Sequence, residues 1–134
     1  MPKHFLVALI MGIGMGMHAL PVQSQEDILR TPDTAQNRLF LADTLGALHY
    51  LTVACSGRMD QSWRGRMAEM MQLEPLSAYE RDDLVAAFNH GYRQEKRYFR
   101  RCTPRTVSQI NAQKRLKAEQ GQFLSTALAD PYLH

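Results

Sequence analysis

The segment Met1–Ser24 limits what the rest of the chain can fold into. It places Lys3 before an apolar run from Phe5 to Leu20 and ends on the small-residue pattern Val22-Gln23-Ser24. This order is typical of a secretory signal peptide, and we expect cleavage after Ser24. Its removal leaves roughly 110 residues, Gln25 to His134, which suits one domain with a modest core.

The alternative for the apolar run is a membrane anchor, since with its flanks the run approaches the length of a short spanning helix. The run is interrupted or ended, however, by Gly12, Gly14, Gly16, His18 and Pro21. No strong cluster of basic residues, which would stop transfer across the membrane, follows it. We therefore expect an exported domain with no stable membrane insertion after cleavage.

The charge balance of the chain is mildly positive. The 16 Lys and Arg residues oppose 13 Asp and Glu residues, which gives a formal net charge of +3. This excess is too small to predict nucleic-acid binding, and an exported protein rarely encounters nucleic acid.

Both cysteines, Cys55 and Cys102, remain after cleavage. In an oxidising compartment, two thiols with no other partner are expected to form a disulfide. They lie too far apart in the sequence for a close-spaced redox pair, and two thiols alone make a poor metal site. Closing a loop of this size would stabilise the fold by about 4 kcal/mol, a large share of the stability of a small domain.

Cap and stop residues predict where the helices lie. Thr31-Pro32-Asp33 offers a cap, a proline and an acid for the start of a first helix, which Gly57 ends. Asp60 can cap a shorter second helix that stops near Pro75. Trp63 and three methionines would face the longer helices from this second helix.

A third helix is predicted from the capping box Ser77-Ala78-Tyr79-Glu80, with an apolar stripe that continues to Cys102. Thr103-Pro104 repeats the cap-plus-proline signal and opens a fourth helix. In an up-down-up arrangement Cys55 and Cys102 come to the same pole. We predict an all-α fold, a small antiparallel helical bundle of about four helices with one disulfide.

Histidine spacing gives no metal site. His49, His90 and His134 remain after cleavage, and none has a second histidine one helical turn away. We expect no metal and no cofactor. His49 and His90 could still converge in space, although single hydrogen bonds to each are the simpler interpretation.

Glu95 is the carboxylate that stands out, because it interrupts the apolar stripe of the third helix. A carboxylate at such a position must find a hydrogen-bond donor or change its pKa. We expect Arg97, Arg100 or Tyr50 to supply the donor. A structural ion pair is the simpler interpretation, and a catalytic acid is the alternative.

The densest chemical feature is basic. Six cations fall close together with only Glu95 opposing them, and aromatic residues are interleaved: Arg93, Lys96, Arg97, Arg100, Arg101 and Arg105, with Tyr92, Tyr98 and Phe99. Arg93, Lys96, Arg97 and Arg100 share one helical face by their spacing. Such a face suits an acidic partner, while the alternative is a solvated face whose last cations complement the helix dipole.

Trp63 forms a second group with Arg58, Arg64 and Arg66. Trp and Arg are enriched in the hot spots of protein interfaces. The alternative is that Trp63 belongs to the core.

The sequence also resembles a known family. The resemblance rests on Leu45-Gly46-Ala47-Leu48-His49-Tyr50-Leu51, Cys55-Ser56-Gly57, Gln61-Ser62-Trp63-Arg64-Gly65-Arg66-Met67, Ala87-Phe88-Asn89-His90-Gly91-Tyr92-Arg93 and Arg101-Cys102-Thr103. These strings are similar to those of small exported alphaproteobacterial proteins that are classed as a domain of unknown function. The resemblance implies a periplasmic location and a link to the control of peptidoglycan hydrolases. It supplies no catalytic residues.

Two functions from different classes follow as expectations. The first is a non-enzymatic periplasmic protein that docks Arg93, Lys96, Arg97, Arg100, Trp63 and Tyr92 on a peptidoglycan hydrolase and inhibits it. The second is an enzyme or sugar-binding accessory protein that acts on peptidoglycan through Glu95 with His49 or His90. A deep pocket that gathers Glu95 and a histidine would favour the second function, and a flat or convex patch of Trp63, Tyr92 and arginines would favour the first.

Overall fold

Four helices make up the described part of the chain. The structure is a computed structural model that describes the backbone of residues 23–129 and the side chains of residues 34–129. The helices are α1 (Gln23–Ser56), α2 (Ser62–Leu73), α3 (Ala78–Tyr98) and α4 (Val107–Ala129), and no strand occurs between residues 23 and 129. The prediction of an all-α bundle is confirmed. The apolar run of the predicted signal peptide lies outside the described residues.

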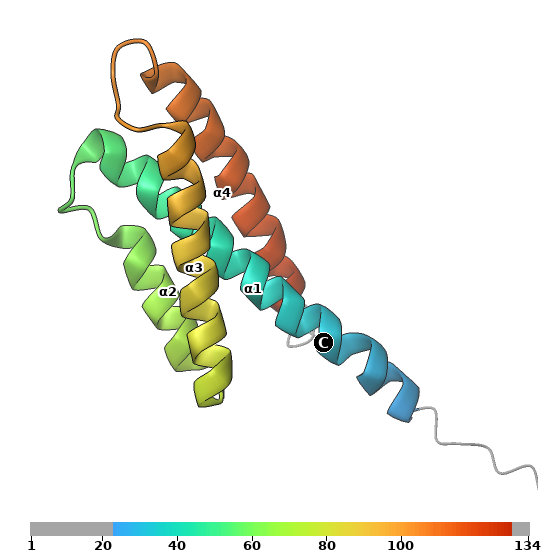
Figure 1. Cartoon of the computed structure of the whole chain (residues 1–134). Helices are drawn as coiled ribbons and strands as arrows, with labels where there is room; N and C mark the ends of the chain where they lie inside the picture. The colour runs from blue at the N-terminus through green and yellow to red at the C-terminus, as the bar shows by residue number, and fades with distance from the viewer. Residues whose placement is uncertain (1–22, 130–134) are drawn as a thin grey trace, which may run out of the picture.

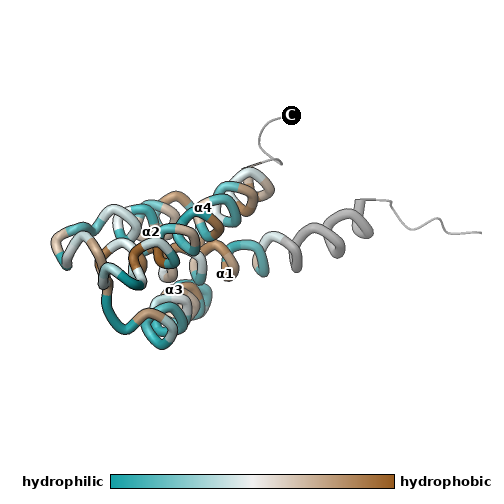
Figure 2. The backbone as a smooth tube through the Cα atoms, turned by 90° about the horizontal axis from the view of Figure 1, so that it is seen from above, coloured by the Kyte–Doolittle hydropathy of each residue, from teal (hydrophilic) through white to brown (hydrophobic). Residues whose placement is uncertain are grey.

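The central element is α1, which contacts each of the other three helices and has its most extensive contact with α3. The chain returns along α2 and again along α4, while α3 runs in the same general sense as α1 and crosses it at an angle (Figure 1). Hydrophobic segments of α1 lie among the other helices (Figure 2). The arrangement buries most side chains of α1 between Leu41 and Thr52 and leaves one side of each other helix in contact with solvent.

The apolar character of α1 has a structural explanation. Thr34–Ser56 is long and apolar enough to cross a membrane by length and composition alone. In the bundle, 61% of the window that passes this test is buried inside the fold. Burial of this extent is what a central bundle helix requires.

The predicted start of the first helix is wrong. Thr31-Pro32-Asp33 was expected to open the helix, but α1 already begins at Gln23 and runs through Pro32. The residues before Pro32 are mostly good helix formers, which favours continuation of the helix toward the N-terminus. The other end is as predicted, because Gly57 follows Ser56 with a φ of 91°, a conformation that suits glycine.

The third helix begins as predicted and ends earlier than predicted. The side chain of Ser77 accepts a hydrogen bond from the Glu80 backbone N–H, and Glu80 bonds back to the Ser77 backbone N–H, so the capping box is present. The helix stops at Tyr98 rather than Cys102. The Tyr50 hydroxyl of α1 donates to the Phe99 carbonyl, which takes up an acceptor at the helix end.

Two glycines allow α1 and α3 to approach closely. A Cβ atom at Gly46 would overlap the Phe88 carbonyl oxygen, and a Cβ atom at Gly91 would overlap the Asp43 carbonyl oxygen. The two backbones therefore touch where the helices cross, and only glycine fits at these positions. This contact fixes how the residues of α3 are directed relative to α1.

The predicted disulfide is confirmed. Cys55 and Cys102 are bonded, with their Cα atoms 5.1 Å apart, within the usual range for such bridges. The bond joins the end of α1 to the segment after α3, at the pole where the sequence placed both residues. A disulfide also indicates an oxidising compartment.

Candidate functional site

The second half of α3 presents chemistry on two sides. Its outer side carries the basic face, which we define as Arg93, Lys96, Arg97 and Arg100. Its inner side faces α1 and α4 and carries Gly91 and Glu95, which are both buried. Each side gathers some of the residues that the sequence singled out.

The basic face is exposed and lines a shallow hollow of about 710 Å³. Within the described residues, none of its four cations forms an ion pair with a carboxylate. Arg97 Nη2 donates to Gln94 Oε1 over 2.6 Å, so the guanidinium keeps its charge while it is oriented. The predicted clustering of these four residues is therefore present, although Arg100 lies beyond the end of α3.

Tyr92 and Trp63 do not belong to the basic face in the structure. Tyr92 is half-buried, and its ring meets Tyr50 edge-on with centroids 5.2 Å apart. Trp63 is half-buried against the core, and its Nε1 donates to Thr52 Oγ1 over 2.9 Å. Tyr98 is 79% exposed, but it lines the cavity of the inner side described below and not the hollow at the cations.

On the inner side lies a polar cavity of about 250 Å³, bounded by α1, α3 and α4. It is lined by Asp43, Ala47, His90, Gly91, Gln94, Glu95, Tyr98, Gln113 and Lys117. Glu95 and His90 thus converge, as one of the two sequence hypotheses required. His49 does not line this cavity.

Glu95 has partners other than those predicted. Gln113 Nε2 donates to its Oε1 over 2.9 Å, and Lys117 Nζ lies 4.0 Å from the same oxygen. The prediction of Arg97, Arg100 or Tyr50 as its donor is wrong, because the arginines lie on the outer side and Tyr50 donates to Phe99. The sequence did carry a signal for the true partners, since Gln113 and Lys117 share a face of α4 one turn apart.

A directed chain of hydrogen bonds connects the basic face to the polar cavity. Arg97 donates to Gln94 Oε1, so the amide nitrogen of Gln94 is free to donate to His90 Nε2, 3.2 Å away. His90 must then carry its proton on Nδ1, which donates to Asp43 Oδ2 over 2.6 Å. The chain ties the side chain of Arg97 to α1 through α3.

His49 is a core residue in this structure. It is buried, and its ring lies 5.8 Å, centroid to centroid, from the rings of Phe88 and Tyr92. Burial holds the pKa of His49 below its ordinary value of 6.5, and the nearby positive charge of Arg64 lowers the pKa further, while Asp60 acts to raise it. The imidazole is therefore neutral at neutral pH.

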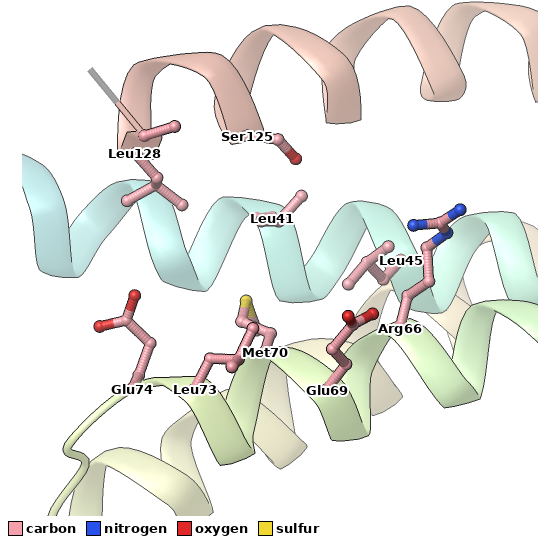
Figure 3. A pocket seen from close by; sticks show the side chains of 10 residues that line it. Leu41, Leu45, Arg66, Glu69, Met70, Leu73, Glu74, Ser125 and Leu128 are labelled. Atoms are coloured by element: carbon pink, nitrogen blue, oxygen red, sulfur yellow. The ribbon is translucent and has the colours of Figure 1, made fainter. Parts of the chain in front are cut away.

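An apolar groove on the other side of α1 was not expected from the sequence. It has a volume of about 320 Å³ and lies between α2 and α4, with Leu41 and Leu45 of α1 between them (Figure 3). Met70 and Leu73 of α2 line one side and Leu128 of α4 lines the other, with Arg66, Glu69 and Glu74 also along the α2 side. Leu73 is largely exposed there.

Comparison with known proteins identifies a family that matches this chain. A family model described as "Protein of unknown function (DUF2385)" matches residues 35–132, which is most of the chain. No curated protein and no solved structure matches the chain significantly.

Proposed function

The chain belongs to the family of unknown function DUF2385, and from that premise we propose that it is a non-enzymatic periplasmic protein that docks its basic face on a peptidoglycan hydrolase and inhibits it. The location is supported by the predicted signal peptide and by the disulfide, which persists in oxidising compartments. The hydrolase partner is suggested by the resemblance described above.

The observation that carries the proposal is the state of the basic face. Four exposed cations lie together around one hollow without a carboxylate partner among the described residues. Concentrated charge of one sign speeds the approach of an oppositely charged surface. Arginine is also one of the residue types that supply much of the binding energy once the surfaces meet.

The proposed mechanism is occlusion of an acidic cleft. A glycosidase cleft that cleaves peptidoglycan carries carboxylates on both sides of the scissile bond. Guanidinium groups bind carboxylates in a bidentate manner, so Arg93 and Arg97 at neighbouring turns of α3 are suited to engage such a cleft. The substrate would then be excluded while the complex lasts.

Capture from a periplasmic extract tests the proposal. The exported protein with its disulfide should retain a hydrolase, and the retention should weaken as salt rises, because salt screens exposed charges. The triple variant Arg93→Glu, Arg97→Glu and Arg100→Glu should lose the hydrolase, mainly through slower association. The matched control changes Arg58, Arg64 and Arg66 to Glu, which applies the same change in charge to another exposed surface.

Two results would contradict the proposal. One is full retention of the hydrolase by the folded Arg93, Arg97 and Arg100 variant. The other is loss of the hydrolase in the Arg58, Arg64 and Arg66 variant alone, which would transfer the docking site to the Trp63 region.

A second candidate function rests on the polar cavity. Glu95 and His90 line it together, as an enzyme or sugar-binding protein acting on peptidoglycan would require. A cavity of about 250 Å³ accommodates one small group rather than a glycan chain, and His90 already donates to Asp43. If this candidate is right, the protein alone should cleave purified peptidoglycan and Glu95→Gln should abolish the cleavage. Under the favoured function neither should occur.

A further inference from the structure

The polar cavity has the features of a formed binding site. Glu95 lies on its wall and is only 4% exposed. Side chains from three helices surround it, so its position is set by the close contact of α1 with α3 at Gly46 and Gly91 and by the packing of α4. A group bound there would meet side chains that packing already holds in place.

One oxygen of this buried carboxylate has no partner. Gln113 and Lys117 both approach Oε1, whereas Oε2 is buried and accepts no hydrogen bond from any described residue. A buried polar atom without a partner is destabilising, and such atoms in native proteins call for an explanation. A ligand that donates a hydrogen bond to Glu95 would provide one.

The charges around the cavity indicate which donor fits. Asp43 and Glu95 are carboxylates, and Lys117 is the one cation among the described residues that line the cavity. His90 is hydrogen-bonded to Asp43 and Gln94, and Gln94 and Gln113 are neutral amides. Two carboxylates therefore oppose one lysine in the lining, which favours a cationic donor over a neutral or anionic one.

We infer that this cavity binds a small polar molecule through a primary ammonium group, which donates a charge-assisted hydrogen bond to Glu95. Asp43 of α1 also lines the cavity and adds to the negative potential. The volume of about 250 Å³ admits either an amino sugar or a short linear amine. Both ligands carry a primary ammonium group. They differ in the rest of the molecule, which the side-chain amides of Gln94 and Gln113 must accommodate.

Substitution of Lys117 should change the affinity for the ligand in the opposite direction from substitution of Glu95. Its Nζ lies 4.0 Å from Glu95 Oε1, so it partly neutralises the carboxylate and competes with an incoming ammonium group. Removal of the Lys117 charge should strengthen binding, whereas removal of the Glu95 charge should weaken it. A purely structural role for these residues would not give opposite changes.

The experiment is an NMR titration of the exported protein with its disulfide formed. The probes are glucosamine, putrescine and N-acetylglucosamine, the last of which keeps the sugar but has no ammonium group. We expect saturable shifts of the Gln113 side-chain amide and of signals around His90 with glucosamine or putrescine, and none with N-acetylglucosamine. Glucosamine alone would identify an amino sugar, putrescine alone a linear amine, and both together recognition of the ammonium group by itself.

Three variants complete the test. Glu95→Gln should weaken binding at least about tenfold, since hydrogen bonds to charged groups are the stronger kind. Lys117→Gln should strengthen it a few-fold. Glu119→Gln removes one negative charge, as Glu95→Gln does, but at an exposed position of α4, and it should leave binding unchanged.

Some results would overturn the inference. These are the absence of saturable shifts with both amines, equal binding of N-acetylglucosamine and glucosamine, or unchanged binding in a folded Glu95→Gln variant. Because the basic face is intact in all three variants, capture of a hydrolase should persist in each. Failure of this inference therefore leaves the proposed function standing.

Discussion

The two sides of α3 have different surroundings over the same few turns of helix. The inner side buries Phe88, Gly91 and Glu95 against the neighbouring helices. The outer side exposes Arg93, Lys96 and Arg97 without a carboxylate partner among the described residues. Under the proposed function, substitutions on the inner side should therefore act on folding, and substitutions on the outer side should act on binding of the partner.

The largest effect should come from the disulfide that fixes the inner side to α1 at one pole. Replacement of Cys55 and Cys102 by Ser should lower the free energy of unfolding by about 4 kcal/mol, because the unfolded chain regains the freedom of the closed loop. Denaturant unfolding of wild-type and variant protein measures this. A difference below about 1 kcal/mol would mean that the bundle holds this pole together without the bridge.

The close contact of α1 with α3 should give the next largest effect. Gly91→Ala should lower the free energy of unfolding by about 3 kcal/mol, because its Cβ would overlap the Asp43 carbonyl oxygen. Gly65→Ala in α2 is the matched control, since a Cβ there meets nothing within 4 Å. The control should stabilise the protein by about 0.5–1 kcal/mol, as alanine favours a helix over glycine. Equal effects of the two changes would contradict the close contact.

Acidification should reveal His49, the buried histidine of α1 whose ring lies close to Phe88 and Tyr92 of α3. His49 has a lowered pKa in the folded protein, so the unfolded chain binds more protons as the pH falls below the ordinary value of 6.5. The stability that neutral His49 contributes is therefore present above pH 6.5 and is lost as the pH falls through the folded pKa. Melting temperatures measured across this range should decline, and His49→Gln should reduce the decline. The same decline in both proteins would show that His49 is not its source.

Local signals in the sequence were sufficient for much of the fold. Ser77 and Glu80 specify a capping box by their spacing alone, and Gly57 specifies the end of α1 through its backbone conformation. The pairing of Cys55 with Cys102 followed from the number of cysteines and the order of helices. Each of these features depends on neighbouring residues or on simple topology.

The features that were mispredicted or missed depend on contacts between helices. The partner of Glu95 could not be found without the register of α4 against α3, which places Gln113 beside it. At the end of α3, the Phe99 carbonyl accepts a hydrogen bond from the hydroxyl of Tyr50, which is far away in the sequence. The direction of the Tyr92 ring is set by the crossing at Gly46 and Gly91, which brings α1 close enough for Tyr50 to meet it. The clustering of Arg93, Lys96 and Arg97 was predictable, because it depends on one helix alone.

The most direct test of the account compares both sides of α3 in one assay. The measurement is the rate at which a periplasmic extract with hydrolase activity clears purified peptidoglycan, with added wild-type protein or variants. The account predicts that the wild-type protein and Glu95→Gln slow the clearance with increasing dose. The triple variant Arg93→Glu, Arg97→Glu and Arg100→Glu should not slow the clearance. Its free energy of unfolding should nevertheless lie within about 0.5 kcal/mol of the wild-type value. Equal slowing by the folded triple variant, or no slowing by the wild-type protein, would contradict the account.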